Sequence, residues 1–307
     1  MLKTDRFEGF IGQDRAKSVL NFVLDIHAAT GYLTPITISA PKGAGKTEIC
    51  KRICQNLAKK SVTINATSID TVETLVEQVL KPHVINSDVS VHFDESHSLR
   101  NNPRVEDFML SVIAPSKEGI NRVFHNGEEL VFDNSRVSWL FSTTELQKHS
   151  DPFLSRTRKI AFEPYKQSEI AQIIEANTPK IKLQTEALEK LASVSRDTPR
   201  QGVMLSKDVV SFCGMRNINY LSFQDCLEFL KRLSINSYGL DENETAYLKL
   251  LTKHGRLTLS ALSNSLEFTR PMVQRSIEPF LIKKRLVTIN SSLRSITNEG
   301  RNFVASL

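Results

Sequence analysis

One glycine-rich segment constrains the fold of this 307-residue chain more than any other feature of the sequence. Residues 40–47 read APKGAGKT and lie between an apolar run at 36–40 and a helical pattern at about 46–59. Gly43 and Gly45 let the backbone curl, so that amide N–H groups and the dipole of the following helix face an anion. The spacing is that of a phosphate-binding loop, although alanine stands first where glycine is usual. We therefore predict a strand, a phosphate-binding turn and a helix in succession.

Two side chains of this loop and two acidic side chains farther along predict a nucleotide site. Lys46 would reach the β- and γ-phosphate oxygens, and Thr47 would ligate a magnesium ion. Asp94 and Glu95 directly follow the stretch 89–93, which reads VSVHF. Asp94 would hold the same magnesium ion, and Glu95 would orient and polarise the attacking water.

Helical and strand patterns alternate through the first 162 residues, which predicts an α/β domain with a parallel sheet covered by helices. The serine and the histidine in 89–93 weaken the strand prediction there, because a strand covered on both faces is usually apolar throughout. Asn126-Gly127 favours a tight hairpin turn between strands at 120–124 and 129–132. Helices are expected at 16–28, 46–59, 71–80 and 103–113, and the other strands at 36–40, 61–65, 88–93 and 136–142.

Two further domains are expected after residue 162. From 167 to 231 the strand signals stop and helical periodicity continues, which predicts a helical domain over 163–238. From 239 to 307 we expect a winged helix, with a first helix capped by Asp241, a helix at 257–266, and another that opens at Pro271. Strands at 286–290 and 294–297 would complete it.

The positive charge is concentrated at the end of the chain. Lys and Arg number 40 against 34 Asp and Glu, a net charge of +6. Residues 256–307 alone hold eight bases and three acids, a net charge of +5. A basic terminal module is typical of proteins that bind the phosphate backbone of nucleic acids, and it is also common on plain solvated surfaces.

Three segments, 10–13 (FIGQ), 40–47 and 93–99 (FDESHSL), together resemble the AAA+ ATPases, and most closely the RuvB family of bacterial branch-migration motors. The resemblance implies ATP and Mg²⁺ as cofactors, and a P-loop domain (1–162) followed by a helical lid (163–238) and a winged helix (239–307). The nucleotide-binding set that it implies comprises Ile11, Pro41, Gly43, Ala44, Gly45, Lys46 and Thr47.

Three downstream segments are similar to further AAA+ motifs. Ser142-Thr143-Thr144 resembles the sensor-1 segment, which implies that Thr144 reads the γ-phosphate, although the following Glu145 stands where RuvB usually has arginine. Residues 152–157 resemble the arginine-finger segment, so Arg156 would reach a neighbouring subunit's γ-phosphate, with Arg158 as the alternative. Residues 195–200 resemble the sensor-2 segment of the lid, which implicates Arg200.

The last domain resembles the RuvB winged helix at 239–241 and 278–282. By this resemblance the turn before Arg294 would reach DNA, and we expect Arg294 to be the strongest single DNA contact. Lys283 and Lys284 end the predicted recognition helix and could touch phosphates, although bases at a helix end are also favoured by the helix dipole.

The resemblance implies an ATP-driven motor that moves branched or duplex DNA. A ring follows from the arginine offered in trans, and we expect it to be a homo-hexamer. Residues 117–134 would correspond to the hairpin that docks RuvA, so a RuvA-like partner is one possibility. A second hypothesis is an origin-binding initiator or clamp-loader-like switch that binds DNA without translocating. A third is a DNA-binding regulator with a degenerate ATPase, against which intact Lys46, Asp94 and Glu95 argue.

Composition predicts a cytoplasmic protein with no membrane segment. The chain has no uncharged apolar run of membrane-spanning length, and its first ten residues carry charges where a signal peptide is apolar. Its four cysteines show neither a CxxC pair nor zinc-ligand spacing, so we expect reduced, mostly buried thiols rather than disulfides or a metal site.

Overall fold

The computed structural model describes residues 6–115, 119–236 and 238–306. The chain forms two compact units, Met1–Tyr165 and Lys166–Leu307. The predicted boundary at residue 162 lies close to this division. The predicted boundary at 238 falls inside the second unit and stays a prediction. Within the described ranges no helix combines the length and the apolar character that a membrane span requires.

A five-stranded sheet forms the centre of the first unit, with the strand order β2-β3-β6-β1-β7. Each neighbouring pair is parallel, which confirms the predicted α/β sheet. The strands are β1 (Ile36–Ser39), β2 (Lys60–Asn65), β3 (Val89–Asp94), β6 (Val137–Thr143) and β7 (Arg158–Ala161). Strand β7 was not predicted because it is a short edge strand that begins with two charged residues, as edges often do.

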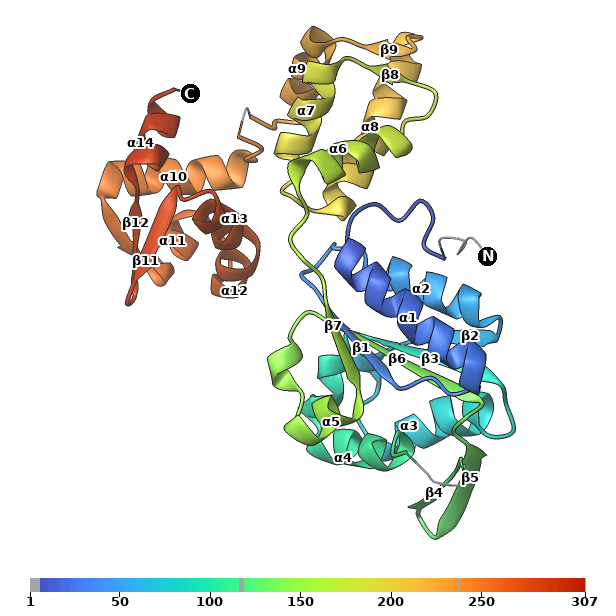
Figure 1. Ribbon diagram of the computed structural model, residues 1–307. Coiled ribbons are helices and arrows are strands. Elements are labelled where there is room, and N and C mark those ends of the chain that lie inside the picture. Colours follow the sequence, from blue (N-terminus) through green and yellow to red (C-terminus); the bar gives the residue numbers. More distant parts are fainter. Residues whose placement is uncertain (1–5, 116–118, 237, 307) are drawn as a thin grey trace. The chain divides into compact units, whose positions relative to one another are not determined.

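Helices cover both faces of this sheet (Figure 1). Helices α1 (Asp14–Thr30) and α2 (Lys46–Leu57) lie on one side, and α3 (Val72–Leu75), α4 (Pro103–Val112) and α5 (Asp151–Arg156) on the other. Helix α3 continues as a π-helix over Val76–Val84, so the helix expected at 71–80 is longer than predicted. Aromatic rings from β3, β6 and α5 pack together in the core, three of them stacked and Phe153 edge-on: Phe93, Trp139, Phe141 and Phe153.

The interpretation that polar residues weaken the strand at 88–93 was wrong. Strand β3 is buried along its length and lies between β2 and β6. His92 is accommodated because its Nε2 lies 2.9 Å from Ser142 Oγ of β6. A polar side chain is tolerated inside a sheet when a neighbouring strand supplies its hydrogen-bond partner.

The predicted hairpin is present as β4 (Ile120–His125) and β5 (Glu128–Asp133). Its turn residues Asn126 and Gly127 have φ of 49° and 80°. Two successive left-handed residues are the signature of the tight turn that Asn-Gly favours. The start of the predicted 117–134 segment, residues 117 and 118, lies outside the described residues.

The second unit begins with a helical part (Figure 1). Its helices are α6 (Gln167–Ala176), α7 (Thr185–Val194), α8 (Pro199–Arg216) and α9 (Phe223–Arg232). The prediction that strands stop at residue 162 was wrong in one detail, since β8 (Lys182–Leu183) and β9 (Tyr220–Leu221) form a two-residue parallel ladder. A two-residue strand is too short to show a period-2 pattern in the sequence.

The end of the second unit is a winged helix, with an antiparallel sheet in the order β10-β12-β11. The sequence was expected to form a helix from residue 257, but β10 occupies 256–258 before the helix begins. The helices are α10 (Glu242–His254), α11 (Leu259–Ser265), α12 (Arg270–Met272), α13 (Glu278–Lys283) and α14 (Asn298–Ala305), with a π-turn at Val273–Ile277. The strands are β10 (Arg256–Thr258), β11 (Val287–Asn290) and β12 (Leu293–Ile296). The predicted Asp241 cap is present as a capping box with Glu244.

Candidate nucleotide site

The glycine-rich loop connects β1 to α2 in the conformation that a phosphate-binding turn needs. Gly43 and Gly45 have backbone φ angles of 82° and 95°, which residues other than glycine rarely adopt. A Cβ on Gly45 would also come within 3.3 Å of Phe10 Cζ. Tyr165 covers the loop from another direction, because its hydroxyl donates to the Ala44 carbonyl at 3.3 Å. Glycine is thus required at position 45 both for its backbone angle and for its lack of a side chain.

Lys46 is the first residue of α2 and is buried. Its ammonium donates to the carbonyl oxygens of Ala40 at 2.9 Å and of Pro41 at 3.2 Å. The charge therefore lies at the positive end of a helix, where an anion is stabilised and a cation is not. A bound phosphate would remove this conflict and offer the ammonium stronger, charged acceptors.

The structure brings together Thr47, in the first turn of α2, and Asp94, at the carboxyl end of β3. Thr47 Oγ1 donates to Asp94 Oδ2 at 3.3 Å. The other oxygen, Oδ1, accepts from Ser142 Oγ at 2.6 Å and from the Glu95 N–H at 3.0 Å. Burial raises the pKa of Asp94, but the hydrogen bonds from Ser142, Glu95 and Thr47 outweigh it and hold the pKa below its usual value. Asp94 is therefore an ionised acceptor with one oxygen fixed by β6.

The hydrogen bonds that hold Asp94 continue through Ser142 to His92. An ionised carboxylate only accepts, so Ser142 must donate to Asp94 and its oxygen must accept from His92 Nε2 at 2.9 Å. Burial lowers the pKa of His92 to about 4, so the ring is neutral and carries its proton on Nε2. His92 and Ser142 together hold Oδ1 and leave Oδ2 directed at Thr47.

Glu95 has a left-handed backbone, with φ of 52°, at the start of the 3₁₀ helix Ser96–Asn101. Such a backbone costs roughly 1–3 kcal/mol in a residue other than glycine or asparagine and is commonest at functional sites. Thr144 Oγ1 donates to Glu95 Oε2 at 3.2 Å, and His97 Nδ1 lies 3.5 Å from the same oxygen. The two side chains predicted to handle the attacking water, Glu95 and Thr144, are thus in direct contact.

His97 and Glu145 surround this pair. His97 Nδ1 also lies 3.0 Å from Thr143 Oγ1, and its Nε2 lies 3.4 Å from Glu145 Oε1. Burial lowers the pKa of His97. Glu145, which departs from the RuvB pattern, is also bonded to Lys148 at 2.9 Å. A histidine thus lies between two carboxylates beside the predicted water-activating residue.

The amino-terminal segment that resembles AAA+ proteins is fixed to the end of the first unit. The Gln13 amide donates to the Glu163 carbonyl at 2.8 Å and accepts from the Glu163 N–H at 2.9 Å. Phe10 meets Phe162 edge-on, with ring centroids 6.2 Å apart. These contacts hold half-buried Ile11 in place, and its role at the nucleotide stays a prediction.

The predicted arginines lie on the surfaces of their own units. Arg156 is exposed at the last residue of α5, where its Nη1 donates to the Pro152 carbonyl at 3.0 Å. Arg158 is exposed on β7. Arg200 is exposed near the start of α8 in the second unit. Their catalytic roles stay predictions.

The prediction that Arg294 contacts DNA needs correction, because the structure buries this side chain. Only 7% of it is exposed, and it forms a two-pronged pair with Glu278, with Nε–Oε1 at 2.8 Å and Nη2–Oε2 at 3.3 Å. Tyr247 donates to the same carboxylate at 3.1 Å. The wing turn that precedes Arg294 consists of uncharged Ser291 and Ser292. Arg294 therefore holds the wing to the helices.

The two lysines predicted to touch phosphates have different surroundings. Lys283 is exposed and pairs with Asp197 at 2.8 Å. Lys284 is half-buried, with its ammonium 5.4 Å from the centre of the Phe280 ring. Both ammonium groups lie at the end of α13, so a role at DNA stays a prediction for each.

Sequence reasoning missed His92, assigned no role to His97, and placed Ser142 and Glu145 in or beside the sensor-1 segment without predicting their contacts with Asp94 and His97. The polar residues in an otherwise apolar strand were the available signal for His92, and they were interpreted as weakening the strand. The donor set at Thr47 and Asp94 fits Mg²⁺, which prefers hard oxygen ligands and usually takes only one or two from protein. The described residues contain no cluster of three or more His, Cys, Asp or Glu side chains that could hold a metal ion by themselves.

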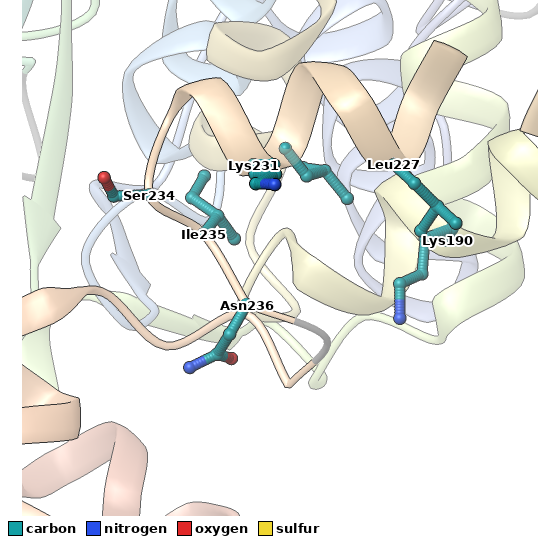
Figure 2. A pocket seen from close by; sticks show the side chains of 7 residues that line it. Lys190, Leu227, Lys231, Ser234, Ile235 and Asn236 are labelled. Atoms are coloured by element: carbon teal, nitrogen blue, oxygen red, sulfur yellow. The ribbon is translucent and has the colours of Figure 1, made fainter. Parts of the chain in front are cut away.

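One hollow of about 340 Å³ lies in the helical part of the second unit (Figure 2). It contains none of the predicted site residues. Its lining combines apolar side chains of α9 with two lysines and the polar segment that follows α9: Lys190, Leu227, Leu230, Lys231, Ser234, Ile235 and Asn236.

Two family models match the chain. Residues 36–165 match "ATPase family associated with various cellular activities (AAA)", and residues 237–305 match "RuvB C-terminal winged helix domain". Curated relatives are named "Holliday junction branch migration complex subunit RuvB". The relative from Mycoplasmopsis synoviae is 26% identical over 311 residues, covering 97% of this chain and 95% of that protein. The one from Campylobacter jejuni is 27% identical over 293 residues, covering 92% and 84%.

Solved structures show the same fold at lower identity. The Thermotoga maritima RuvB Holliday junction branch migration motor aligns with a TM-score of 0.80 at 22% identity, covering 98% of this chain and 97% of that one. The Aeropyrum pernix ORC2 protein aligns with a TM-score of 0.57 at 15% identity, covering 99% and 96%. The loop, the acidic strand end and the two matched domains together make the chain RuvB-like, with an AAA ATPase domain and a winged helix of the RuvB type.

Proposed function

We propose that this chain is an ATP-hydrolysing motor that drives branch migration of four-way DNA junctions in recombination and repair. The observation that carries the proposal is a complete set of ATPase side chains, Lys46, Asp94 and Glu95, in one chain with a winged helix of the RuvB type. Curated relatives that match over almost the whole chain bear the corresponding name, which supports the same function.

The chemistry assigned to the nucleotide site follows from its hydrogen bonds. Lys46 would exchange two carbonyl acceptors for phosphate oxygens. Thr47 Oγ1 and Asp94 Oδ2 would hold Mg²⁺, which when bound neutralises the charge on the transferring phosphoryl group. Glu95 would accept a hydrogen bond from the attacking water. Thr144, which donates to Glu95 Oε2, would fix the position of the Glu95 carboxylate.

A ring is proposed from the exposure of Arg156. An arginine offered to a neighbour's γ-phosphate stabilises the transition state by roughly 10³–10⁵ in rate. When every copy offers its arginine to the next, the contact is heterologous and closes into a cyclic oligomer, for which six subunits are our proposal.

The lid and the winged helix share contacts that would transmit motion. Arg196 Nη2 bonds Glu244 Oε2 at 2.9 Å, and its guanidinium lies 4.8 Å from the centre of the Phe280 ring. The next residue, Asp197, pairs with Lys283. These residues belong to the same short segment as Arg200, so a shift of Arg200 on hydrolysis would displace the winged helix with it.

The hairpin β4/β5 carries exposed apolar side chains that suit a protein-binding surface. Ile120, Phe124 and Val131 are 44%, 69% and 36% exposed, and an apolar group of this kind on a projecting hairpin is typical of a docking surface. We propose a RuvA-like junction-binding protein as that partner, and the cytoplasm as the compartment where the complex works on DNA.

The test is an ATP-dependent branch migration assay. The purified protein, with a RuvA-like partner where the source encodes one, should dissociate a labelled four-way junction with ATP and not with a non-hydrolysable analogue. A four-way junction should stimulate ATP hydrolysis more than linear duplex of equal length. An initiator or clamp-loader-like switch, to which the ORC2 likeness corresponds, would bind DNA and hydrolyse ATP without moving the junction.

A further inference from the structure

Two buried residues outside every motif form a hydrogen-bonded pair inside the first unit. Glu106 of α4 and His149, which precedes α5, both have side chains that are 0% exposed, and His149 Nδ1 lies 2.8 Å from Glu106 Oε1. A buried carboxylate is costly unless it is paired and hydrogen-bonded. Its presence here therefore calls for a functional or structural reason.

Glu106 holds the start of helix α5. The N–H of Ser150, the N-cap residue of α5, lies 3.3 Å from Glu106 Oε2, and Arg100 Nη1 lies 3.3 Å from the same oxygen. Burial raises the pKa of Glu106, but hydrogen bonds from His149 and Ser150 outweigh it and keep the pKa below its usual value. An ionised carboxylate thus fixes the residue at which the helix carrying Arg156 begins.

His149 connects this helix to the catalytic strand end. Nδ1 donates to the ionised Glu106 carboxylate, and Nε2 on the opposite side of the ring lies 3.0 Å from Ser96 Oγ. Ser96 is buried and directly follows Glu95. The imidazole also stacks on Phe153 of α5, with ring centroids 4.3 Å apart and an interplanar angle of 8°. One side chain therefore contacts both the residue after Glu95 and the body of α5.

We propose that His149 and Glu106 are positioning residues for Arg156. They hold α5 so that the Arg156 guanidinium reaches the γ-phosphate bound by the neighbouring subunit. The proposal rests on the trans role of Arg156 given under the proposed function. Helix α5 is only six residues long, so its direction is set by the contacts at its first turn. A displacement of about 1 Å at a group that contacts the reacting phosphate can lower the rate on the order of 100-fold.

The experiment uses mixtures of two inactive subunits. Glu95→Gln subunits keep Arg156 but cannot turn over ATP. Arg156→Ala subunits keep Glu95 but cannot donate the arginine. Mixed in one ring, they should restore ATP hydrolysis at sites where an Arg156→Ala subunit receives the arginine of a Glu95→Gln neighbour. This restoration tests the trans role itself, and its absence would overturn both that role and the positioning proposal.

His149→Leu is then added to one subunit type at a time. In the donor, Glu95→Gln/His149→Leu, we expect restored hydrolysis to fall about tenfold or more. In the receiver, Arg156→Ala/His149→Leu, we expect a clearly smaller loss, because the receiver's α5 supplies no arginine to the shared site and its His149 meets the catalytic strand end through Ser96, next to Glu95. Equal loss in both arrangements, or no loss in either, would overturn the positioning proposal while leaving the trans role intact.

Two controls separate positioning from misfolding. His149→Asn in the donor keeps an N–H near the place of Nδ1 and should recover most of the hydrolysis that His149→Leu loses. Binding of a fluorescent ATP analogue by each variant should match its parent, because the nucleotide residues are unchanged. A donor variant that binds the analogue normally, assembles normally and yet is not rescued by asparagine would count against the hydrogen bond to Glu106 as the cause.

Discussion

Charged side chains were predicted to act both at the nucleotide site and at the DNA-binding end of the winged helix, yet the structure places the two groups differently. In the first unit, Thr47, Asp94, Glu95 and Thr144 meet in hydrogen-bonded pairs at the strand ends. In the second, the arginine expected at DNA is buried against Glu278. A loop whose backbone is fixed by glycines and a following helix directs its side chains locally. Whether an arginine on a short strand faces solvent depends instead on a residue far away in the sequence, which no local pattern reveals.

The largest expected effect sharpens the first half of this comparison. Glu95→Gln removes the carboxylate that orients the attacking water, and the amide is nearly the same size. We expect the ATPase rate to fall roughly 10²–10⁴-fold while ATP affinity stays within a few fold. Single-turnover hydrolysis together with equilibrium binding separates the two quantities. Turnover at the wild-type rate would remove Glu95 from the mechanism.

The next prediction concerns the buried pair of the winged helix. Arg294→Met leaves Glu278 buried without its cation, so the winged helix should lose about 3–5 kcal/mol of stability. Hydrogen exchange of the α10 and β12 amides in the full-length chain reports this loss locally. The salt dependence of DNA binding, measured at a temperature where the variant is folded, should not change.

A double variant serves as the control for this prediction. Arg294→Met combined with Glu278→Leu removes both charges, and replacing a buried pair by apolar groups is often neutral, so much of the stability should return. If Arg294→Met instead kept normal hydrogen exchange and lost DNA affinity, Arg294 would be a DNA contact rather than a support for the wing.

The smallest effect tests whether the end of α13 meets phosphates. Lys284→Ala removes one half-buried ammonium, which lies over the Phe280 ring. If it contacts a phosphate, the slope of log K against log salt should fall in magnitude by about one. Gln274→Ala, a nearby exposed and uncharged change, provides the matched control. An unchanged slope for Lys284→Ala would move the DNA contact elsewhere.

Local patterns were sufficient for the parallel sheet, the Asn-Gly hairpin and the Asp241 capping box, because each depends on residues that are neighbours in the sequence. They failed where a partner from another strand decides the structure. His92 was interpreted as a weakness of β3 because its partner Ser142 belongs to β6. Strand β10 was interpreted as the start of a helix because its pairing with β12 is not visible in Arg256–Thr258 alone.

The candidate site shows the same limit. Lys46, Thr47, Asp94 and Glu95 follow from motif spacing, whereas the residues that hold them do not. Ser142 fixes Asp94, and His149 lies between Ser96 and Glu106, and neither role has a sequence signature. Such supporting contacts join segments that are distant in the chain, so only the folded structure reveals them.

Calorimetry can show whether Lys46, Asp94 and Glu95 surround one magnesium-bound triphosphate. Titration of ATP into the wild-type protein with Mg²⁺ should show one site per chain, and Lys46→Ala should weaken that binding about 100-fold or more, in line with the loss of charged hydrogen bonds worth roughly 1.5–3 kcal/mol each. No heat of binding in the wild-type protein, or equal affinity in the two proteins, would contradict the account.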